Sequence, residues 1–278
     1  MTRRRRFEIA LLVMAWSGLT WGFIIEPCFF LVETRAEIHP RAWPKELDGL
    51  KIAAISDIHA GSPFVREKRI KEVVRRVNEA NPDVIVLLGD FVISSAGGKF
   101  MPPEELATLL RELRAPLGVY AVLGNHDWWL NGPRVRNALA AGGMRVLENE
   151  GVTLTKNGQP LRLIGLADYW ERSPDTSAPM KGVPGTMPAI ALIHEPDYFP
   201  EIPERIALTL AGHTHGGQVR LPFIGSPIVP SRFGQRYARG LIKEGTKQLF
   251  VTTGVGTSII PIRFGVPPEY ALLTLRSP

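Results

Sequence analysis

Five short polar blocks of the chain stand beside or just after apolar runs, and they contain side chains of the types that bind metal ions. Seven candidate ligands are Asp57, His59, Asp90, Asn125, His194, His213 and His215. Neutral imidazoles, carboxylates and amide oxygens suit borderline-hard divalent metals, not a hydrophobic core. A lone histidine is more often a hydrogen-bonded structural residue. The recurrence of such groups after successive apolar runs nevertheless indicates a metalloenzyme.

The apolar runs are the elements that must position these ligands. They are rich in Val, Ile, Leu and Ala, as buried strands are, and cover residues 51–56, 84–88, 119–123, 190–193 and 206–211. In open α/β sheets, ligands bind beyond the carboxyl ends of the strands. We therefore expect five strands to deliver their polar ends to one place.

The spacing of the candidate ligands fits two metal ions. Asp90 stands alone after a strand and is the expected bridge, because a carboxylate has two oxygens to share. Asp57 and His59 are two residues apart and so point to the same side of an extended chain; the two histidines of the last block share this spacing. Asn125 and His194 complete the second ion. Two metals about 3.5–4 Å apart activate a bridging water for attack on a phosphoryl group.

The ligand types also limit the choice of metal. Oxygen and nitrogen donors without a thiolate suit manganese, iron, zinc or cobalt better than copper(I) or calcium. We expect two divalent ions, with manganese first and iron or zinc as alternatives.

Alternating strand and helix patterns from residue 48 onward predict an α/β fold. Helices are expected at 65–78, 103–113 and 134–141, and strands at 31–38, 153–156, 161–165, 248–253 and 270–275. Asn157 and Gly158 predict a hairpin turn between two of these strands. Residues 168–188 contain four prolines and no periodicity, which predicts a long loop of the kind that often forms a lid. The β-rich second half favours two packed sheets with helices outside.

Composition excludes several functional classes. The chain has 278 residues and a formal net charge of +6, of which Arg3 to Arg6 supply four charges. The remainder is nearly balanced, so no basic nucleic-acid footprint is present and we expect no nucleic-acid partner, which argues against a nuclease. The single Cys28 excludes an internal disulfide.

The N-terminus predicts a membrane segment. Four arginines precede residues 7–25, which are largely apolar and would span roughly 28 Å as a helix. We expect an uncleaved anchor within residues 1–32, with an export signal and a buried helix as alternatives. The arginines should stay cytoplasmic, which places a connector (33–47) and a catalytic domain (48–278) outside a bacterial inner membrane. His39, in the connector, is expected at the surface.

The order of the five blocks, from Asp-x-His through Gly-Asp, Gly-Asn-His-Asp and His to Gly-His-x-His, resembles the calcineurin-like metallophosphoesterases over residues 48–275. The resemblance implies a four-layer α/β/β/α sandwich. It implies that one metal is held by Asp57, His59, Asp90 and His215, and the other by Asp90, Asn125, His194 and His213. His126 would contact the phosphate and assist the leaving oxygen, with Asp127 orienting its imidazole.

Sequence around residues 212–218, 254–257 and 261–264 resembles a bacterial membrane-associated branch of phosphodiesterases, whose relatives include UDP-2,3-diacylglucosamine hydrolases. We expect a phosphodiesterase or pyrophosphatase that acts on a lipid-linked or envelope substrate. Alternatives are a UDP-2,3-diacylglucosamine hydrolase of lipid A synthesis and a broad phosphomonoesterase. The chain shows no long apolar helical cap, and its expected orientation faces away from the cytoplasm. A non-catalytic membrane scaffold is disfavoured because all seven ligands are present.

Three further residues are candidates for substrate binding. Arg232 and Arg236 lie in a segment that alternates basic and aromatic residues, which fits a phosphate-contacting rim or, alternatively, a solvated loop. Trp128, just after the His126 block, could line a substrate wall or cap the core.

Overall fold

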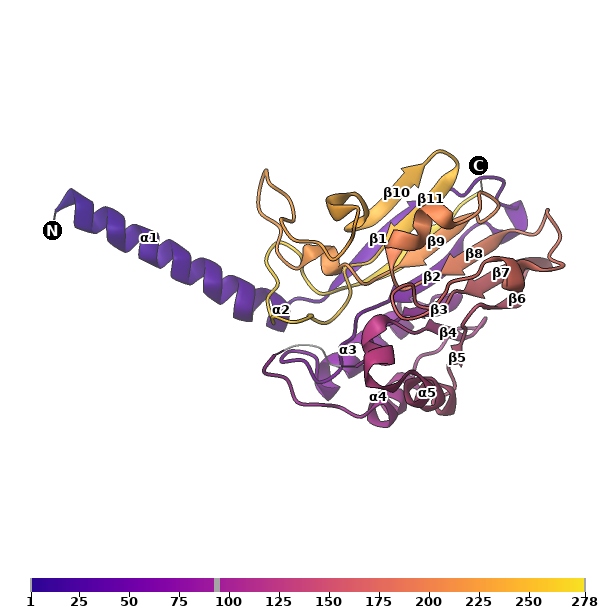
Figure 1. Cartoon of the computed structure of the whole chain (residues 1–278), viewed down its shortest axis with the longest axis horizontal. Helices are drawn as coiled ribbons and strands as arrows, with labels where there is room; N and C mark the ends of the chain where they lie inside the picture. The colour runs from indigo at the N-terminus through magenta and orange to yellow at the C-terminus, as the bar shows by residue number, and fades with distance from the viewer. Residues whose placement is uncertain (1, 93–95, 278) are drawn as a thin grey trace.

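The computed structural model describes residues 2–92 and 96–277. Within these residues, two six-stranded sheets pack face to face and helices cover their outer sides (Figure 1). The expected four-layer sandwich is therefore confirmed, and an apolar helix precedes it. All five apolar runs next to the polar blocks form buried strands.

The first sheet has the order β1-β12-β2-β3-β4-β5. Its strands are β1 (Val32–Ile38), β12 (Glu269–Leu275), β2 (Leu50–Ile55), β3 (Val84–Leu88), β4 (Val119–Val122) and β5 (Arg145–Val146). Strands β2 to β5 are parallel, and the crossovers between them contain α3 (Glu67–Glu79), α4 (Pro103–Leu110) and α5 (Asn125–Ala141). Parallel pairing brings the carboxyl ends of these strands to one edge.

The second sheet has the order β10-β11-β9-β8-β7-β6. Its strands are β10 (Gly240–Glu244), β11 (Lys247–Val251), β9 (Leu208–Ala211), β8 (Ala189–Leu192), β7 (Gln159–Gly165) and β6 (Glu150–Lys156). The central strands are parallel, and the predicted Asn157-Gly158 hairpin joins β6 to β7. The outer face is covered by short helices only, chiefly α6 (Ser177–Met180), η3 (Pro196–Glu201) and η5 (Gly234–Tyr237). The fourth layer is therefore thin.

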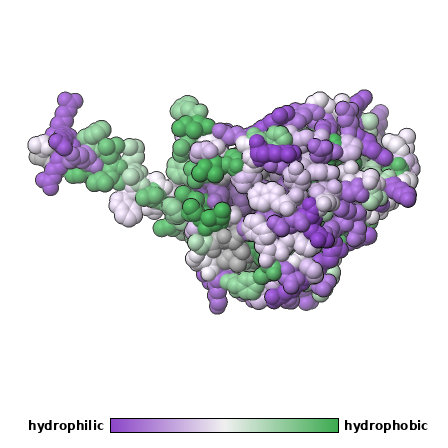
Figure 2. All heavy atoms as spheres, in the orientation of Figure 1, coloured by the Kyte–Doolittle hydropathy of each residue, from purple (hydrophilic) through white to green (hydrophobic). Residues whose placement is uncertain are grey.

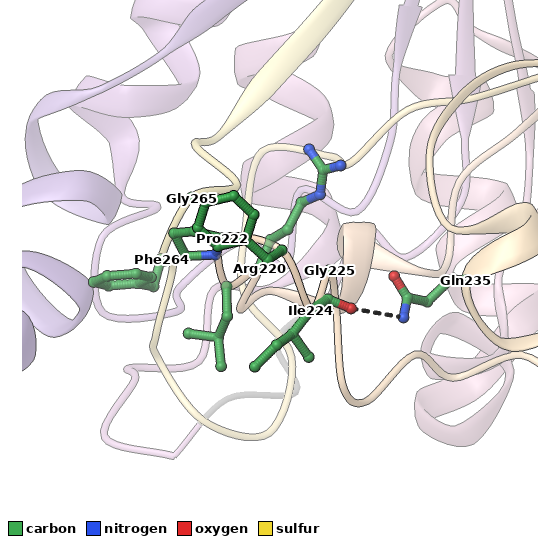
Figure 3. A pocket seen from close by; sticks show the side chains of 9 residues that line it. Arg220, Pro222, Ile224, Gly225, Gln235, Phe264 and Gly265 are labelled. Carbon is green, nitrogen blue, oxygen red and sulfur yellow. Dashed lines mark hydrogen bonds between the residues drawn. The ribbon is translucent and has the colours of Figure 1, made fainter.

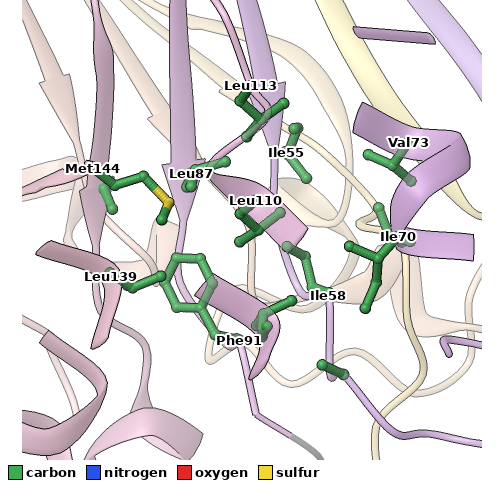
Figure 4. Close-up of a cluster of buried hydrophobic side chains, with 14 of the residues drawn as sticks. Ile55, Ile58, Ile70, Val73, Leu87, Phe91, Leu110, Leu113, Leu139 and Met144 are labelled. Atoms are coloured by element: carbon green, nitrogen blue, oxygen red, sulfur yellow. The ribbon is translucent and has the colours of Figure 1, made fainter. Parts of the chain in front are cut away.

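Two apolar layers hold the sandwich together. Between the sheets, Ile52 and Leu88 belong to the same cluster as Leu163 and Leu210 of the second sheet. On the other side of the first sheet, helix side chains pack on Ile55, Leu87 and Phe91 (Figure 4). Helix α3 contributes Ile70, Val73, Val74 and Val77, whose spacing places them on one helical face.

The N-terminal segment is one continuous helical stretch, Arg3–Phe29, and contains an apolar 18-residue window with a mean hydropathy of 1.7, of which 6% is buried. It consists of α1 (Arg3–Thr20), a π-helical turn η1 (Trp21–Ile25) and α2 (Glu26–Phe29). At 27 residues it is about 40 Å long, enough to cross a membrane by length and composition. It projects from the domain and exposes apolar side chains along its length (Figures 1 and 2).

Several elements differ from the sequence expectation. Helix α5 begins at Asn125, whereas the sequence predicted a helix only from residue 134. An extended residue, Asn131, kinks it before Gly132 and Pro133, and these helix breakers hide the first turns from a periodicity search. The short helices η2 (Lys45–Leu47) and η4 (His215–Gly217) were not predicted either.

Trp43 and Leu47 of the connector are buried in the core between the sheets.

Candidate dinuclear metal centre

The carboxyl ends of strands from both sheets meet at one site. Asp57 follows β2, Asp90 follows β3 and Asn125 follows β4, while His194 follows β8 and His213 follows β9. The seven predicted ligands are all buried. The predicted convergence is therefore observed, and the site lies on the seam between the two sheets.

The first cluster contains Asp57, His59 and His215. Nε2 of His59 lies 3.1 Å from Nε2 of His215, which in turn lies 3.3 Å from Oδ1 of Asp57. Ligand atoms bound to one ion at about 2.0–2.2 Å stand roughly 3 to 3.5 Å apart. Nε2 of His59 and Oδ1 of Asp57 are 4.0 Å apart, so all three atoms are close enough to one another to share a divalent ion.

The second cluster contains Asp90, His194 and His213. Nε2 of His194 lies 3.2 Å from Asp90 Oδ2 and 3.2 Å from His213 Nδ1. The same Asp90 oxygen lies 3.6 Å from Nε2 of His59 in the first cluster. Asp90 therefore stands between the clusters, where a bridging carboxylate would have to be.

Left-handed backbone is a shared property of the ligands that the sequence did not reveal. Asp57, His59, Asp90, His213 and His215 have φ values of 51°, 45°, 55°, 69° and 50°. Non-glycine residues seldom adopt this region, and each such residue costs about 1–3 kcal/mol. The surrounding fold therefore holds five ligands in a conformation that an isolated chain would avoid.

Close backbone approach explains two of the glycines in the blocks. A Cβ on Gly89 would lie 2.7 Å from the Gly124 nitrogen and 2.7 Å from Nδ1 of His194. A Cβ on Gly124 would collide with Oδ1 of Asp90. Only glycine lets the two strand ends come this near to the bridge.

Backbone carbonyls fix the tautomers of two histidines. Nδ1 of His59 lies 2.9 Å from the Val92 carbonyl oxygen, and Nδ1 of His194 lies 2.6 Å from that of Leu88. A carbonyl only accepts, so each Nδ1 carries the proton and donates it. Each Nε2 then keeps its lone pair for the site, as metal-binding histidines require.

The electrostatics of the clusters favour neutral imidazoles at His59 and His213 and an ionised Asp90. Burial lowers the pKa of His59 to about 4 and that of His213 to about 3. Burial alone would raise the pKa of Asp90, but the neighbouring His194 holds it well below its usual value. Burial likewise opposes a charge on His194, yet Asp90 raises its pKa. The site thus attracts positive charge beside Asp90.

Unpartnered buried oxygens show that the donor set fits metal ions. Oδ1 of Asp57 and Oδ1 of Asn125 are buried and make no hydrogen bond in the described part of the chain. Buried polar atoms in folded proteins are usually paired, and the described part of the chain has ten further exceptions besides these two. Both oxygens belong to predicted ligands, and a cation would satisfy both.

His126 and Asp127 lie in the first turn of α5, but only His126 faces the clusters. Its Nε2 is 3.9 Å from Oδ2 of Asp90, and its ring is partly exposed. The expected contact from Asp127 to the His126 imidazole is not observed. Asp127 instead accepts hydrogen bonds from the backbone nitrogens of Gly124, Asp90 and Phe91. At the third position of the helix, its carboxylate caps the helix and fixes the Asp90 loop.

Aromatic side chains border the site, and the structure separates the two adjacent tryptophans. Trp129 is exposed, and its ring meets the His126 ring edge-on, with the ring centroids 4.4 Å apart. Trp128 is partly buried: it packs against the core, and the Arg172 guanidinium lies over its ring. The ring centroids of Trp170 and His213 are 4.4 Å apart. The sequence analysis did not single out Trp170. It belongs to the 168–188 loop, whose aperiodic sequence was the available signal.

The two candidate arginines contact residues outside the metal clusters. Arg232 stacks over Tyr169, one residue before Trp170, and its guanidinium donates to the Asp197 carbonyl. Arg236 forms an ion pair with Glu244 at 2.7 Å. Arg232 therefore reaches the loop that borders the site, whereas Arg236 is tied to β10.

Sequence analysis also missed the structural importance of Arg263. It is fully buried and donates to the carbonyl oxygens of Thr253, Gly254 and Gly256. The same guanidinium lies 3.4 Å from Nδ1 of His215. Arg263 thus fixes the loop behind the first cluster.

Comparison with known proteins agrees with this geometry. The family model "Calcineurin-like phosphoesterase" matches residues 50–217. The chain is 33% identical to the uncharacterized metallophosphoesterase YkuE of Bacillus subtilis, over 95% of this chain and 91% of that protein. It is 31% identical to the phosphodiesterase YaeI of Escherichia coli, over 99% and 100%. It is 26% identical to the UDP-2,3-diacylglucosamine pyrophosphatase LpxG of Chlamydia trachomatis, over 94% of each. With both buried His/Asp clusters present, the chain belongs to the calcineurin-like phosphoesterase family and is a dinuclear metal phosphoesterase.

Proposed function

We propose that the protein hydrolyses a phosphodiester or pyrophosphate bond in a lipid-linked or cell-envelope substrate. The observation that carries the chemistry is the position of Asp90 between two buried His/Asp clusters, with His126 partly exposed beside it. The similarity to the phosphodiesterase YaeI supports the choice of bond. The apolar N-terminal helix supports a substrate at the membrane.

In this proposal, Asp57, His59, Asp90 and His215 hold one ion, and Asp90, Asn125, His194 and His213 hold the other. Manganese is the proposed metal, with iron or zinc as alternatives, because the donors are oxygen and nitrogen without thiolate. When bound, the two ions would activate a water molecule and stabilise the charge that develops on the phosphoryl oxygens.

The chain's own residues then position the substrate and handle its leaving group. His126 lies next to Asp90 at the N-terminal end of α5, where the helix dipole favours an anionic phosphate. Burial lowers the pKa of His126, so its ring is neutral at neutral pH and can donate a hydrogen bond to the leaving oxygen. Asp127 acts as a positioning residue that fixes the Asp90 loop. Arg232 and Arg236 are proposed to contact the substrate from the rim, together with Trp128.

The proposed location is a bacterial inner membrane, with the helix as a single-pass anchor and the catalytic domain outside the cytoplasm. The helix Arg3–Phe29 is long and apolar enough to span the bilayer. Arg3 to Arg6 at its start favour a cytoplasmic N-terminus.

Hydrolysis by the full chain in detergent tests this function. We expect manganese-dependent turnover of bis-p-nitrophenyl phosphate that exceeds turnover of p-nitrophenyl phosphate and is lost with EDTA. The Asp127→Asn variant loosens the Asp90 loop and so measures how much turnover is lost through loop disorder alone. The His126→Gln variant should instead reduce turnover without changing the metal content. A strong preference for the monoester would instead support a broad phosphomonoesterase. Absence of turnover for both esters in the metal-loaded protein would contradict a general hydrolase.

The relative LpxG favours a second candidate, hydrolysis of UDP-2,3-diacylglucosamine. Release of UMP from this substrate in detergent micelles, measured against the chromogenic diester, decides between the two. A rate for UDP-2,3-diacylglucosamine well above that for the diester would make it the preferred substrate.

A further inference from the structure

Exposed apolar side chains gather on the face of the domain from which the N-terminal helix leaves. Figure 2 shows them beside the base of the helix. They come from α2 and from two loops of the catalytic domain, residues 221–228 and 258–262. The large exposed members are Phe29, Phe223, Ile224, Ile228, Ile259 and Ile260. Ile228 is 78% exposed and Ile259 is 71% exposed, values that soluble surfaces tolerate singly but seldom in a group.

Both loops hold a bulky apolar residue in a strained conformation. Phe223 has a φ of 66° and Ile259 a φ of 61°. The left-handed region is markedly unfavourable for a β-branched residue such as isoleucine. Leu221 and Gly225 exchange backbone hydrogen bonds, so the turn between them presents Phe223 to solvent. Strain of this kind persists where the exposed position serves a function.

The loops are fixed to the base of the helix. The Arg263 nitrogen donates to the Gly22 carbonyl oxygen at 2.9 Å. The buried Glu26 carboxylate accepts hydrogen bonds from the nitrogens of Gly265 and Val266 and from Nε1 of Trp21. The helix base and the 258–266 segment therefore form one unit, so a bilayer crossed by the helix lies against these loops.

The same segment leads back to the metal centre. Gly256 packs so closely on the first ligand block that a Cβ there would lie 3.0 Å from Cβ of His59. The side chain of Gln218, three residues after His215, donates to the Ser258 carbonyl at 3.0 Å. The apolar loop 258–262 thus begins at the wall of the site and ends at the helix.

A cavity of about 590 Å³ lies under the other loop and is lined by both polar and apolar groups, including one cation (Figure 3). Arg220, Phe223, Ile224 and Phe264 line it. In the described part of the chain, the Arg220 guanidinium forms no ion pair or hydrogen bond. A free guanidinium beside apolar side chains matches the boundary between lipid phosphates and acyl chains.

We propose that this face rests on the lipid bilayer, that Phe223, Ile224, Ile259 and Ile260 insert into it, and that an amphiphilic phosphoester reaches the metal centre directly from the membrane plane. A bilayer is the occupant because the face is continuous with the helix Arg3–Phe29. The proposal rests on the membrane anchor and hydrolase activity proposed above.

Site-specific labelling of the full chain tests insertion without any need for a known substrate. In a Cys28→Ser background, Phe223→Cys and Ile259→Cys would carry an NBD label in phosphatidylglycerol/phosphatidylethanolamine vesicles. Leu241→Cys, at an exposed apolar position on β10, is the matched control. We expect doxyl lipids to quench the labels at 223 and 259 at least about threefold more than the label at 241, since inserted side chains lie about 5–10 Å deep. Equal quenching at all three positions would overturn the proposal. A blue-shifted label that lipid quenchers do not reach would identify a second protein copy as the occupant and would also overturn it.

Activity separates failure of this inference from failure of the proposed function. The double variants Phe223→Ser/Ile224→Ser and Ile259→Ser/Ile260→Ser should retain wild-type turnover of bis-p-nitrophenyl phosphate in detergent. With UDP-2,3-diacylglucosamine embedded in the same vesicles as the substrate, their turnover should fall about tenfold, whereas Leu241→Ser should not change it. Loss of insertion without loss of lipid turnover would refute delivery from the membrane. A wild-type chain that inserts its loops but hydrolyses no phosphoester would instead disprove the proposed function alone.

Discussion

Replacing His213 with glutamine in the metal-free protein should remove part of its sensitivity to acid. The His213 side chain is only 6% exposed, and burial lowers its pKa from 6.5 to about 3. Between these values the unfolded chain binds a proton at this histidine and the folded chain does not. The free energy of unfolding must therefore decrease as the pH falls from about 6.5 toward 3.

The size of the effect follows from the difference between the pH and the pKa of His213 in the unfolded chain. At pH 5 this difference is about 1.5 pH units, which corresponds to about 2 kcal/mol of unfolding free energy. Between pH 7 and pH 5, wild-type protein should thus lose about 2 kcal/mol more stability than His213→Gln, because glutamine does not titrate. Urea unfolding of the full chain in detergent and EDTA, followed by tryptophan fluorescence, measures this difference.

His39→Gln provides the matched control, since His39 is exposed on the connector. Its stability should follow wild type at both pH values. Identical losses for wild type and His213→Gln would refute the argument, because they would mean that His213 accepts its proton as readily in the folded protein as in the unfolded one.

Three further predictions concern the site and its supports. Asp90→Asn should lower the metal content of the loaded protein from two ions to one or fewer and reduce turnover at least about a hundredfold, as elemental analysis and diester hydrolysis would show. Trp170→Ala should raise KM several-fold with little change in kcat and shift unfolding by no more than about 0.5 kcal/mol, because the side chain is exposed; steady-state kinetics and urea unfolding test this. Arg263→Met should destabilise the protein by about 3–5 kcal/mol in urea unfolding, because it leaves several buried carbonyl oxygens without a donor.

Much of the fold could be predicted because its signals are local. The strands that carry the ligands are short apolar runs followed at once by polar residues, and strand polarity alone sends those residues to one edge. Helix α3 was recognisable from four apolar residues at helical spacing. The start of α5 was not, because Asn131 and the following Gly-Pro pair interrupt its period.

The parts of the site that could not be predicted depend on contacts between distant segments. Asp127 has the right position in sequence to support His126, yet the approach of the Asp90 loop to the helix start gives its carboxylate backbone partners instead. Trp170 reaches His213 only through the path of a long loop. Likewise, nothing local to Arg263 indicates that its guanidinium closes the loop behind His215.

The seam between the sheets gives the two metal sites a mechanical consequence. His59 and His215, which share the first cluster, are 156 positions apart in the chain. His194 of the second cluster bonds Leu88, 106 positions away and two residues before Asp90. An ion shared across such a separation is a cross-link, and tying a loop of this length restricts the unfolded chain by about 5 kcal/mol in the chain-entropy model. The ions needed for hydrolysis would thus also fasten one sheet to the other, in a chain whose single cysteine allows no disulfide to do so.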